Sequence, residues 1–225
     1  MIKKLNNLLI FDLDGTIYDS SYTTVKAFQI AVNKLNNYYN LNLYLPREEE
    51  IYLYIGYPAW EVFRQLYPDT DPKLRQTLDK LVFEEECNAI LKGEGSLYTG
   101  AYQTLELLVK MGFNLAIASN CRRRYWQSIF NYFNLEPLFK RVLCIEDYPA
   151  GGKAYIVSKL LEEFKPDRAF LIGDTLKDWE AAQSNGLPFI ACLWGYGKEE
   201  DLKALSPFAV VKEFPQIGQV LNIVK

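Results

Sequence analysis

The chain of 225 residues carries 25 basic and 28 acidic side chains and is 49% hydrophobic, a composition typical of one globular domain or of one domain with an insert. It contains no histidine, which excludes a Ser-His-Asp triad, a Cys-His pair and every histidine-ligated metal site. Its net charge of −3 argues against nucleic acid or an anionic membrane surface as a partner.

Short apolar runs alternate with helical patterns along most of the chain. The first run, Leu8–Phe11, predicts a strand buried on both faces. Similar runs follow at 113–118, 142–145, 169–172, 189–193 and 209–211, and helical patterns lie at 101–111, 123–133, 154–164 and 178–185. This alternation predicts an α/β fold with a doubly wound, mostly parallel, Rossmann-like sheet.

One stretch of the chain contains helical patterns only. Between residues 20 and 92 these patterns lie at 22–37, 47–54, 59–67 and 72–91, separated by turn signals. We therefore expect an all-helical insert of four-helix-bundle size at 20–92, and an α/β core made of 1–19 and 93–225. The chain re-enters the core through Gly93 and Gly95, which suits a hinge or, equally, a simple turn.

Polar residues follow the ends of the predicted strands, where ligands bind in open α/β sheets. They are Asp12, Asp14 and Thr16 after the first strand, Ser119 and Asn120 after the second, Lys153 beyond the third, and Asp174 and Asp178 after the fourth. Any one of them alone is more often a turn or cap residue. Carboxylates crowded at one edge, however, repel one another unless a cation offsets their charge. Without His or Cys ligands, this oxygen-only set favours Mg²⁺.

The same residues suggest phosphoryl chemistry. A carboxylate such as Asp12 can attack phosphorus and form an acyl phosphate. Asp14 is placed to protonate the leaving oxygen and then to activate water. Ser119 and Lys153 can hold the remaining phosphoryl oxygens.

Four segments, in this order, resemble the motifs of the haloacid dehalogenase superfamily. They are Phe11–Ile17, Ser119, Lys153 and Gly173–Asp178. The resemblance covers essentially the whole chain, and the insert is similar to the C1-type cap of the phosphoglycolate phosphatase-like and β-phosphoglucomutase-like members. Many relatives carry Lys-Pro at the third motif, whereas Lys153 is followed here by Ala154.

The resemblance implies roles for the residues that could touch a phosphate ester. Asp12 is expected to be the nucleophile and a metal ligand, and Asp14 the general acid and base, with its backbone carbonyl on the metal. Ser119, Asn120 and Lys153 are expected to bind phosphate, and Lys153 also to balance the charge of Asp12.

For the metal, the resemblance implies Asp174 as a further Mg²⁺ ligand, and Asp178 as a ligand or as an acceptor for metal-bound water. The expected function is a Mg²⁺-dependent phosphatase that hydrolyses a small phosphorylated metabolite through an aspartyl-phosphate intermediate. The alternatives are a sugar phosphomutase, which passes the phosphate to a second sugar hydroxyl, and a catalytically silent protein that binds a phosphorylated ligand. Either a monomer or a homodimer fits.

The four cysteines, Cys87, Cys121, Cys144 and Cys192, are widely spaced and form no C-x-x-C pair, so a zinc site is not expected. Cys144 and Cys192 lie in apolar runs and are expected to be buried thiols. The longest apolar runs, of about eight residues, are far shorter than the roughly 20 that cross a bilayer. We therefore expect a cytoplasmic protein without a membrane partner.

Two groups of residues have more than one interpretation. The insert's aromatic side chains either face the site or serve packing; these are Tyr52, Tyr54, Tyr57 and Trp60. Arg47 and Arg64 either bind a second anionic group of the substrate or lie on a solvated face. A solvated face is also expected for the run 122–124, which is Arg-Arg-Arg.

Overall fold

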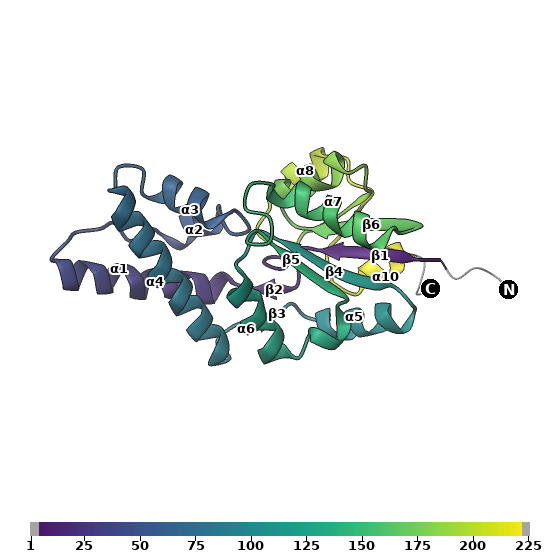
Figure 1. Ribbon diagram of the computed structural model, residues 1–225, viewed down its shortest axis with the longest axis horizontal. Helices are drawn as coiled ribbons and strands as arrows, with labels where there is room; N and C mark the ends of the chain where they lie inside the picture. Colours follow the sequence, from purple (N-terminus) through teal and green to yellow (C-terminus); the bar gives the residue numbers. More distant parts are fainter. Residues whose placement is uncertain (1–4, 222–225) are drawn as a thin grey trace.

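The computed structural model describes residues 5–221, so residues 1–4 and 222–225 of the expected core lie outside the described part. A sheet covered by helices forms one part of the molecule, and a group of helices forms the other (Figure 1). Among the described helices, none has both the length and the apolar character needed to span a membrane.

The described part contains a six-stranded parallel sheet. Its strands are β1 (Asn7–Phe11), β4 (Asn114–Ser119), β5 (Arg141–Cys144), β6 (Arg168–Gly173), β7 (Phe189–Cys192) and β8 (Ala209–Val211). Their spatial order is β5-β4-β1-β6-β7-β8. After β1, the chain places β4 and β5 on one side of it and then β6, β7 and β8 on the other. The carboxyl end of β1 is therefore the switch point at which such sheets bind ligands. The predicted α/β fold is confirmed.

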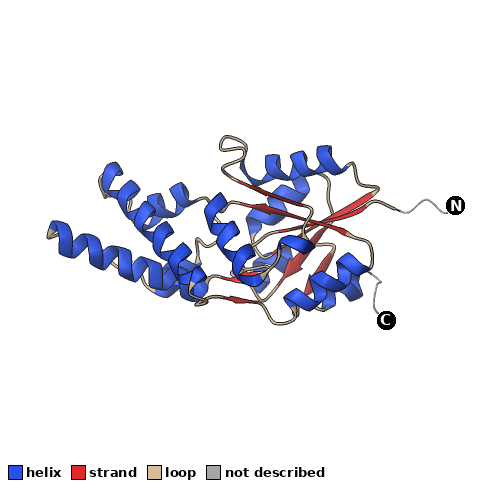
Figure 2. Ribbon diagram, turned by 60° about the horizontal axis from the view of Figure 1, so that its bottom comes forward, coloured by secondary structure: helices blue, strands red, loops and turns tan. Residues whose placement is uncertain are grey.

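Both faces of the sheet are covered by helices (Figure 2). The helices are α5 (Ala101–Lys110), α6 (Arg123–Phe133) and α10 (Gln216–Val220) on one face, and α7 (Gly152–Phe164), α8 (Leu176–Ser184) and α9 (Glu199–Ala204) on the other. In β1, Leu9 and Phe11 pack into the first hydrophobic cluster, whereas Leu8 and Ile10 pack into the second. Alternate residues of a strand face opposite sides, so this two-sided burial explains why the strands are continuous apolar runs.

The helical part consists of α1 (Ser21–Tyr39), α2 (Glu48–Tyr52), α3 (Ala59–Leu66) and α4 (Pro72–Leu91), all of which lie within residues 20–92. These helices share a hydrophobic cluster of their own, in which Phe28 of α1 stacks on Phe63 of α3 and Leu78 of α4 is fully buried. Local signals define the start of α4, because Asp71 accepts hydrogen bonds from the first free N–H groups and Pro72 opens the helix.

A short antiparallel ribbon connects the two parts, where β2 (Tyr18–Asp19) pairs with β3 (Ser96–Leu97). The sequence does not predict this ribbon, because strands of two residues have no detectable periodicity. A Cβ atom on Gly95 would lie 1.7 Å from Tyr18 Oη, and Gly93 has a φ of +76°. A side chain is therefore unfavourable at both positions, whether or not the segment acts as a hinge. The 3₁₀ turn η1 (Glu136–Leu138), α9 and α10 are also short and unpredicted.

Candidate active site

The carboxylates that follow the central strands meet at one edge of the sheet. Asp12 follows β1, Asp174 follows the neighbouring β6, and Asp178 lies in the first turn of α8. One carboxylate oxygen from each residue lies within 4.8 Å of the other two. The three side chains are 2%, 0% and 0% exposed, respectively. Three negative groups are therefore crowded together away from water.

Burial and mutual repulsion make these carboxylates costly to ionise. Burial is the largest cause that raises the pKa of Asp12 well above its usual range, and the negative charge of Asp178 raises it further. The pKa of Asp174 is raised for the same two reasons. A cation bound among these groups would remove the cost of ionising them.

Lys153 brings an ammonium group to this cluster from the first turn of α7. Its Nζ atom lies 2.8 Å from Asp12 Oδ2 and 2.7 Å from Asp178 Oδ1. Burial alone would lower the pKa of Lys153, but the two carboxylates reverse the effect and raise it, so the ammonium group stays charged. When all three carboxylates are ionised, one positive charge still leaves two negative charges unbalanced.

The donor set fits a hard divalent cation. Asp12 Oδ2 is buried and, besides its charge contact with Lys153, accepts no well-oriented hydrogen bond from the described residues. All the candidate donors are carboxylate oxygens, which suit such ions. Asp178 already accepts three hydrogen bonds, from Thr175 N, Thr175 Oγ1 and Lys153 Nζ. Asp12 and Asp174 therefore have more free lone pairs for a metal, and Asp178 mainly holds Lys153 in place.

Asp14 lies outside the three-carboxylate cluster and lines a cavity that faces the helical part. Its Oδ1 atom accepts a 2.6 Å hydrogen bond from Tyr125 Oη. Burial raises the pKa of Asp14 to about 6, although the hydrogen bond from Tyr125 lowers it. A carboxyl group with a pKa near neutrality can both donate and accept a proton at physiological pH.

Two loops hold Asp174 in position. Thr16 Oγ1 donates to Asp174 Oδ1 at 2.9 Å, and the backbone N–H of Tyr196 donates to Oδ2 at 2.8 Å. Gly15, between Asp14 and Thr16, has a φ of +77°, and a Cβ atom there would lie 2.2 Å from Asp174 Oδ2. Only glycine fits this position without displacing the carboxylate.

The expected phosphate-binding residues divide into two groups. Ser119, at the end of β4, is 2% exposed, and its Oγ atom accepts from the Cys121 N–H at 3.2 Å, which leaves its own hydrogen free to donate. Ser119 and Lys153 lie at the same sheet edge as the aspartates. The Asn120 side chain, in contrast, donates to the carbonyl oxygen of Gly56 in the helical part at 2.9 Å. Its amide thus connects the two parts of the molecule.

A cavity of about 110 Å³ lies between the helical part and the sheet edge. Asp14 and Ser119 belong to its core side, and the helical part contributes mainly apolar and aromatic side chains. Four aromatic residues of the insert are expected either to face the site or to serve packing, and of these Tyr54 and Tyr57 line the cavity. Tyr52 instead stacks on Tyr196, and Trp60 is 62% exposed.

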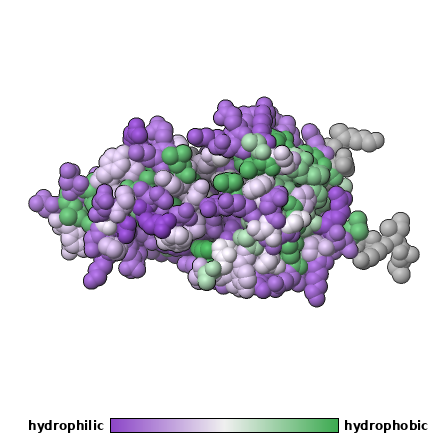
Figure 3. Space-filling view, turned by 90° about the horizontal axis from the view of Figure 1, so that it is seen from above, coloured by the Kyte–Doolittle hydropathy of each residue, from purple (hydrophilic) through white to green (hydrophobic). Residues whose placement is uncertain are grey.

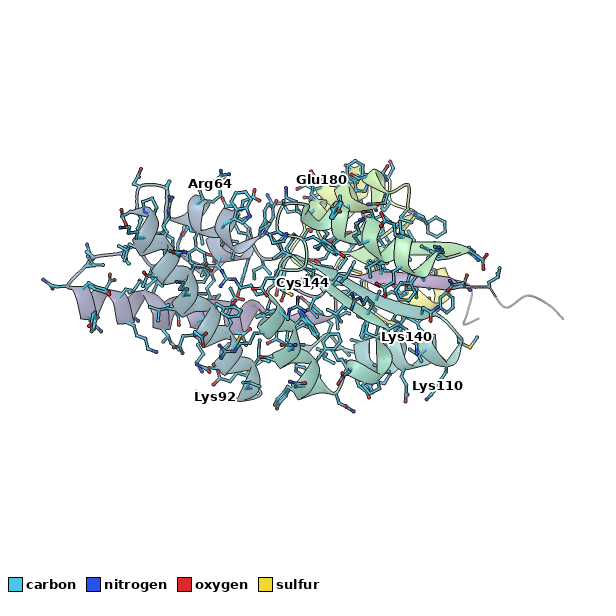
Figure 4. All side chains as sticks on the ribbon, in the orientation of Figure 1. Arg64, Lys92, Lys110, Lys140, Cys144 and Glu180 are labelled. Atoms are coloured by element: carbon cyan, nitrogen blue, oxygen red, sulfur yellow. The ribbon has the colours of Figure 1, made fainter. Side chains whose placement is uncertain are left out.

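Arg47 and Arg64 take the second of their two interpretations, because both side chains are exposed. Arg64 lies on the outer side of the helical part (Figure 4), with its guanidinium 5.2 Å from the centroid of the Trp60 ring. Arg47 pairs with Glu50. Neither lines the cavity.

The solvated face expected for the run 122–124 holds for Arg123 and Arg124, whose side chains are each 51% exposed, but not for Arg122. Arg122 and Arg124 form ion pairs with Asp79 and Glu84 of α4, and the Arg122 side chain is only 25% exposed. These pairs cross from the sheet part to the helical part.

Sequence reasoning missed the residues that support the site from other elements. Tyr125 is in the first turn of α6, a helix that the sequence does predict, but the pattern alone does not show that this turn faces Asp14. Glu86 lies in α4 among other acidic residues and gives no signal that it lines the cavity. Tyr196 belongs to a Gly-Tyr-Gly segment, and those glycines are the one available clue to a close backbone approach.

Glu86 gives a testable pH dependence of stability. Thr24 Oγ1 donates to it at 2.8 Å, Asp14, Asp79 and Arg122 line the same cavity, and burial raises its pKa to about 8. The pKa of Glu86 is therefore higher in the folded protein than the value of 4.5 expected for the unfolded chain, so the folded state binds a proton more tightly. As a result, the contribution of Glu86 to stability falls as the pH rises from 4.5 to about 8. The melting temperature of Glu86→Gln relative to wild type should therefore rise over this range.

Differential scanning calorimetry at both ends of the range measures this difference. The matched control is Glu85→Gln on the same helix, whose carboxylate pairs with Lys34 at 2.6 Å, and its melting temperature relative to wild type should stay nearly constant. A Glu86→Gln difference that does not change with pH would contradict the prediction.

Comparisons with known proteins agree with this geometry. Residues 9–192 match the family described as haloacid dehalogenase-like hydrolase. The chain is 25% identical over 217 residues to a 5′-nucleotidase of Pseudomonas aeruginosa, covering 95% of each chain. It is 25% identical over 233 residues to a phosphoglycolate phosphatase of Haemophilus influenzae, covering 95% of this chain and 97% of the relative.

Among solved structures, a predicted phosphatase from Clostridium acetobutylicum superimposes with a TM-score of 0.81 and 22% identity, covering 98% of this chain and 100% of that chain. This likeness shows the shared fold, whereas the family match extends from β1 to β7 and includes every aspartate of the site. The chain therefore belongs to the haloacid dehalogenase-like hydrolase family, among its phosphatases.

Proposed function

We propose that the protein hydrolyses a small phosphate monoester in two steps, with Asp12 as the nucleophile, Asp14 as the general acid and base, and Mg²⁺ as the cofactor. The observation that carries this proposal is the arrangement of the aspartates. Asp12 is buried beside Lys153 in an oxygen-only cluster, and Asp14 faces the cavity with a pKa near 6. This arrangement supplies a nucleophile in the buried cluster and a proton donor at the cavity.

In the first step, an oxygen of Asp12 attacks phosphorus while the bond from phosphorus to the leaving oxygen breaks. Protonated Asp14 gives its proton to that oxygen, so the product leaves as a neutral alcohol. The hydrogen bond from Tyr125 Oη to Asp14 Oδ1 orients the carboxyl group for this transfer. The result is a phosphorylated Asp12.

In the second step, Asp14 is ionised and takes a proton from water as the water oxygen attacks phosphorus. The bond between phosphorus and the Asp12 oxygen breaks, inorganic phosphate is released, and both aspartates return to their initial state. A pKa of about 6 allows Asp14 to serve in both directions.

Other residues of the site stabilise the charge of the phosphoryl group. Lys153 and the hydroxyl of Ser119 are placed to bind its oxygens, and Asp178 holds Lys153 through their ion pair. Asp12 and Asp174, with the backbone carbonyl of Asp14, would hold Mg²⁺. When bound, this ion neutralises negative charge between the nucleophile and the phosphoryl oxygens.

We further propose that residues 20–92 form a cap domain, which excludes water and selects the leaving group, over a core made of 1–19 and 93–225. The contacts of Asn120 with Gly56 and of Arg122 with Asp79 support a closed arrangement. A phosphomutase must in addition bind a second phosphate of its sugar bisphosphate. The cavity offers no unpaired basic side chain from its described lining for that purpose, which favours the hydrolase.

Phosphate release from an aryl phosphate tests the proposal. Purified protein should release inorganic phosphate from 4-nitrophenyl phosphate in the presence of Mg²⁺, and release should stop after EDTA treatment and return when Mg²⁺ is added. Acid-quenched protein should carry a phosphate on a peptide that contains Asp12. Activity that is indifferent to EDTA, or label on another residue, would contradict the mechanism.

A further inference from the structure

The cavity beside Asp14 offers no free positive group among its described lining residues. Arg122 is the basic residue among its described lining residues, and it is paired with Asp79, which lines the same cavity. The Arg122 guanidinium also lies 4.8 Å from the Phe83 ring centroid. An arginine that is already paired and stacked gives little attraction to a further anion.

Glu86 is a third acidic residue in the described cavity lining, besides Asp14 and Asp79. It lies on α4, and its Oε1 atom accepts a 2.8 Å hydrogen bond from Thr24 Oγ1 of α1. A carboxyl group with lone pairs to spare can accept a hydrogen bond from a hydroxyl or amino group of a bound molecule. An anionic group at this place would instead lose its water among apolar walls without a free positive partner among the described lining residues.

The remaining walls are apolar or aromatic. Phe28, Tyr54, Ile55, Tyr57, Val62 and Phe83 contribute to them, and Figure 3 shows hydrophobic side chains reaching the surface near the middle of the molecule, between hydrophilic ones. An apolar cavity of about 150 Å³ accommodates benzene, so a volume of about 110 Å³ suits a group of about ring size. Such walls favour an apolar body over a heavily hydroxylated one.

We propose that this cavity selects phosphate monoesters whose leaving group is small, uncharged and mostly apolar, with a hydrogen-bond donor that Glu86 accepts. It discriminates against leaving groups that carry a carboxylate or a second phosphate. This inference rests on the proposed function, because it assigns a substrate class to the same site. It separates the chain from the phosphoglycolate phosphatase of Haemophilus influenzae, whose named substrate carries a carboxylate.

Binding to the Asp12→Asn variant tests the proposal without turnover. The probes are 4-(hydroxymethyl)phenyl phosphate and 4-carboxyphenyl phosphate, which differ in one substituent, and calorimetry with Mg²⁺ present gives both dissociation constants. The hydroxymethyl ester should bind at least about tenfold more tightly, because a carboxylate buried in this cavity would have no positive partner to replace its water.

Two further substitutions in the Asp12→Asn background test the residues named. Asp79→Asn frees Arg122 and should increase the affinity for the carboxyphenyl ester by about fivefold or more. Glu86→Gln should reduce the ratio of the two dissociation constants when binding is measured above pH 8, where Glu86 is ionised. Glu85→Gln, on the same helix and paired with Lys34, is the matched control and should leave the preference unchanged.

The outcomes separate this proposal from the proposed function. If the carboxyphenyl ester binds as tightly as the hydroxymethyl ester, or if neither binds, the selectivity inferred for the cavity is wrong, even when the wild-type protein releases phosphate from both. If the binding preference holds but the wild-type protein releases phosphate from neither ester, the hydrolase function fails and the selectivity stands. Unchanged affinities in both Asp79→Asn and Glu86→Gln would overturn the roles of these residues.

Discussion

Replacing Asp12 with Asn should lower the rate of phosphate release by more than about 10⁴-fold, the scale of loss seen when a covalent nucleophile is removed. The amide is nearly the same size as the carboxylate but is a far poorer nucleophile, and it removes the negative charge that faces Lys153 at 2.8 Å. Steady-state release of phosphate from 4-nitrophenyl phosphate measures the loss. Asp69→Asn, at an exposed position of the helical part, is the control and should retain full activity.

The Asp14→Asn variant should fail in a different way. Nitrophenolate is a good leaving group that needs little protonation, so the first step can still proceed. The second step needs a base to activate water, and Asn cannot supply it. A rapid mix should therefore show a burst of about one equivalent of nitrophenol per enzyme, without matching inorganic phosphate, because covalent intermediates accumulate when their breakdown is blocked. Equal release of both products at a normal rate would exclude Asp14 as the base.

Together the two variants test the separation that the structure suggests. Asp12 is buried against Lys153 and the other carboxylates, whereas Asp14 contacts Tyr125 and borders the cavity. If both variants lost the burst, Asp14 would be needed for the first step even with a good leaving group. If Asp12→Asn kept the burst, another residue would be the nucleophile.

Much of the fold could be predicted from the sequence because its signals are local. The strands are buried on both faces, so each one is an apolar run. The polar residues that follow parallel strands lie at the carboxyl edge of the sheet, however the helices pack. For this reason Asp12, Asp174 and Lys153 could be placed together from the sequence. The ribbon formed by β2 and β3 could not, because its two-residue strands are defined by pairing between distant segments.

The supporting residues of the site could not be predicted for a related reason. Tyr125 reaches Asp14 across 111 residues of sequence, and Arg122 meets Asp79 across 43. Nothing in the local pattern around them states which side of a helix faces the cavity. Glu86 shows this most clearly, because one acidic residue in a helix rich in such residues becomes a cavity residue only after α1 and α4 pack together.

Adding Mg²⁺ should stabilise the folded protein, since the folded state alone brings Asp12, Asp174 and Asp178 within 4.8 Å of one another. At a hundredfold excess over the dissociation constant the gain is about 2.7 kcal/mol, which for a chain of this size is a rise of roughly 5–10 °C in melting temperature. Asp174→Asn should lose most of this rise, whereas Asp69→Asn should keep it. Thermal scans with a Mg²⁺ titration, started from EDTA-treated protein, measure the effect.

The Mg²⁺-dependent rise in melting temperature should also depend on pH, and the electrostatics of the site determine whether it increases or decreases. Burial and repulsion raise the pKa of both Asp12 and Asp174, so at low pH these carboxyl groups hold protons that a metal must displace. The Mg²⁺-dependent rise in melting temperature should therefore increase from about pH 5 to about pH 8. A rise that is the same at both values, or that persists in Asp174→Asn, would mean that the ion binds elsewhere, and the excess negative charge at the sheet edge would then need another partner.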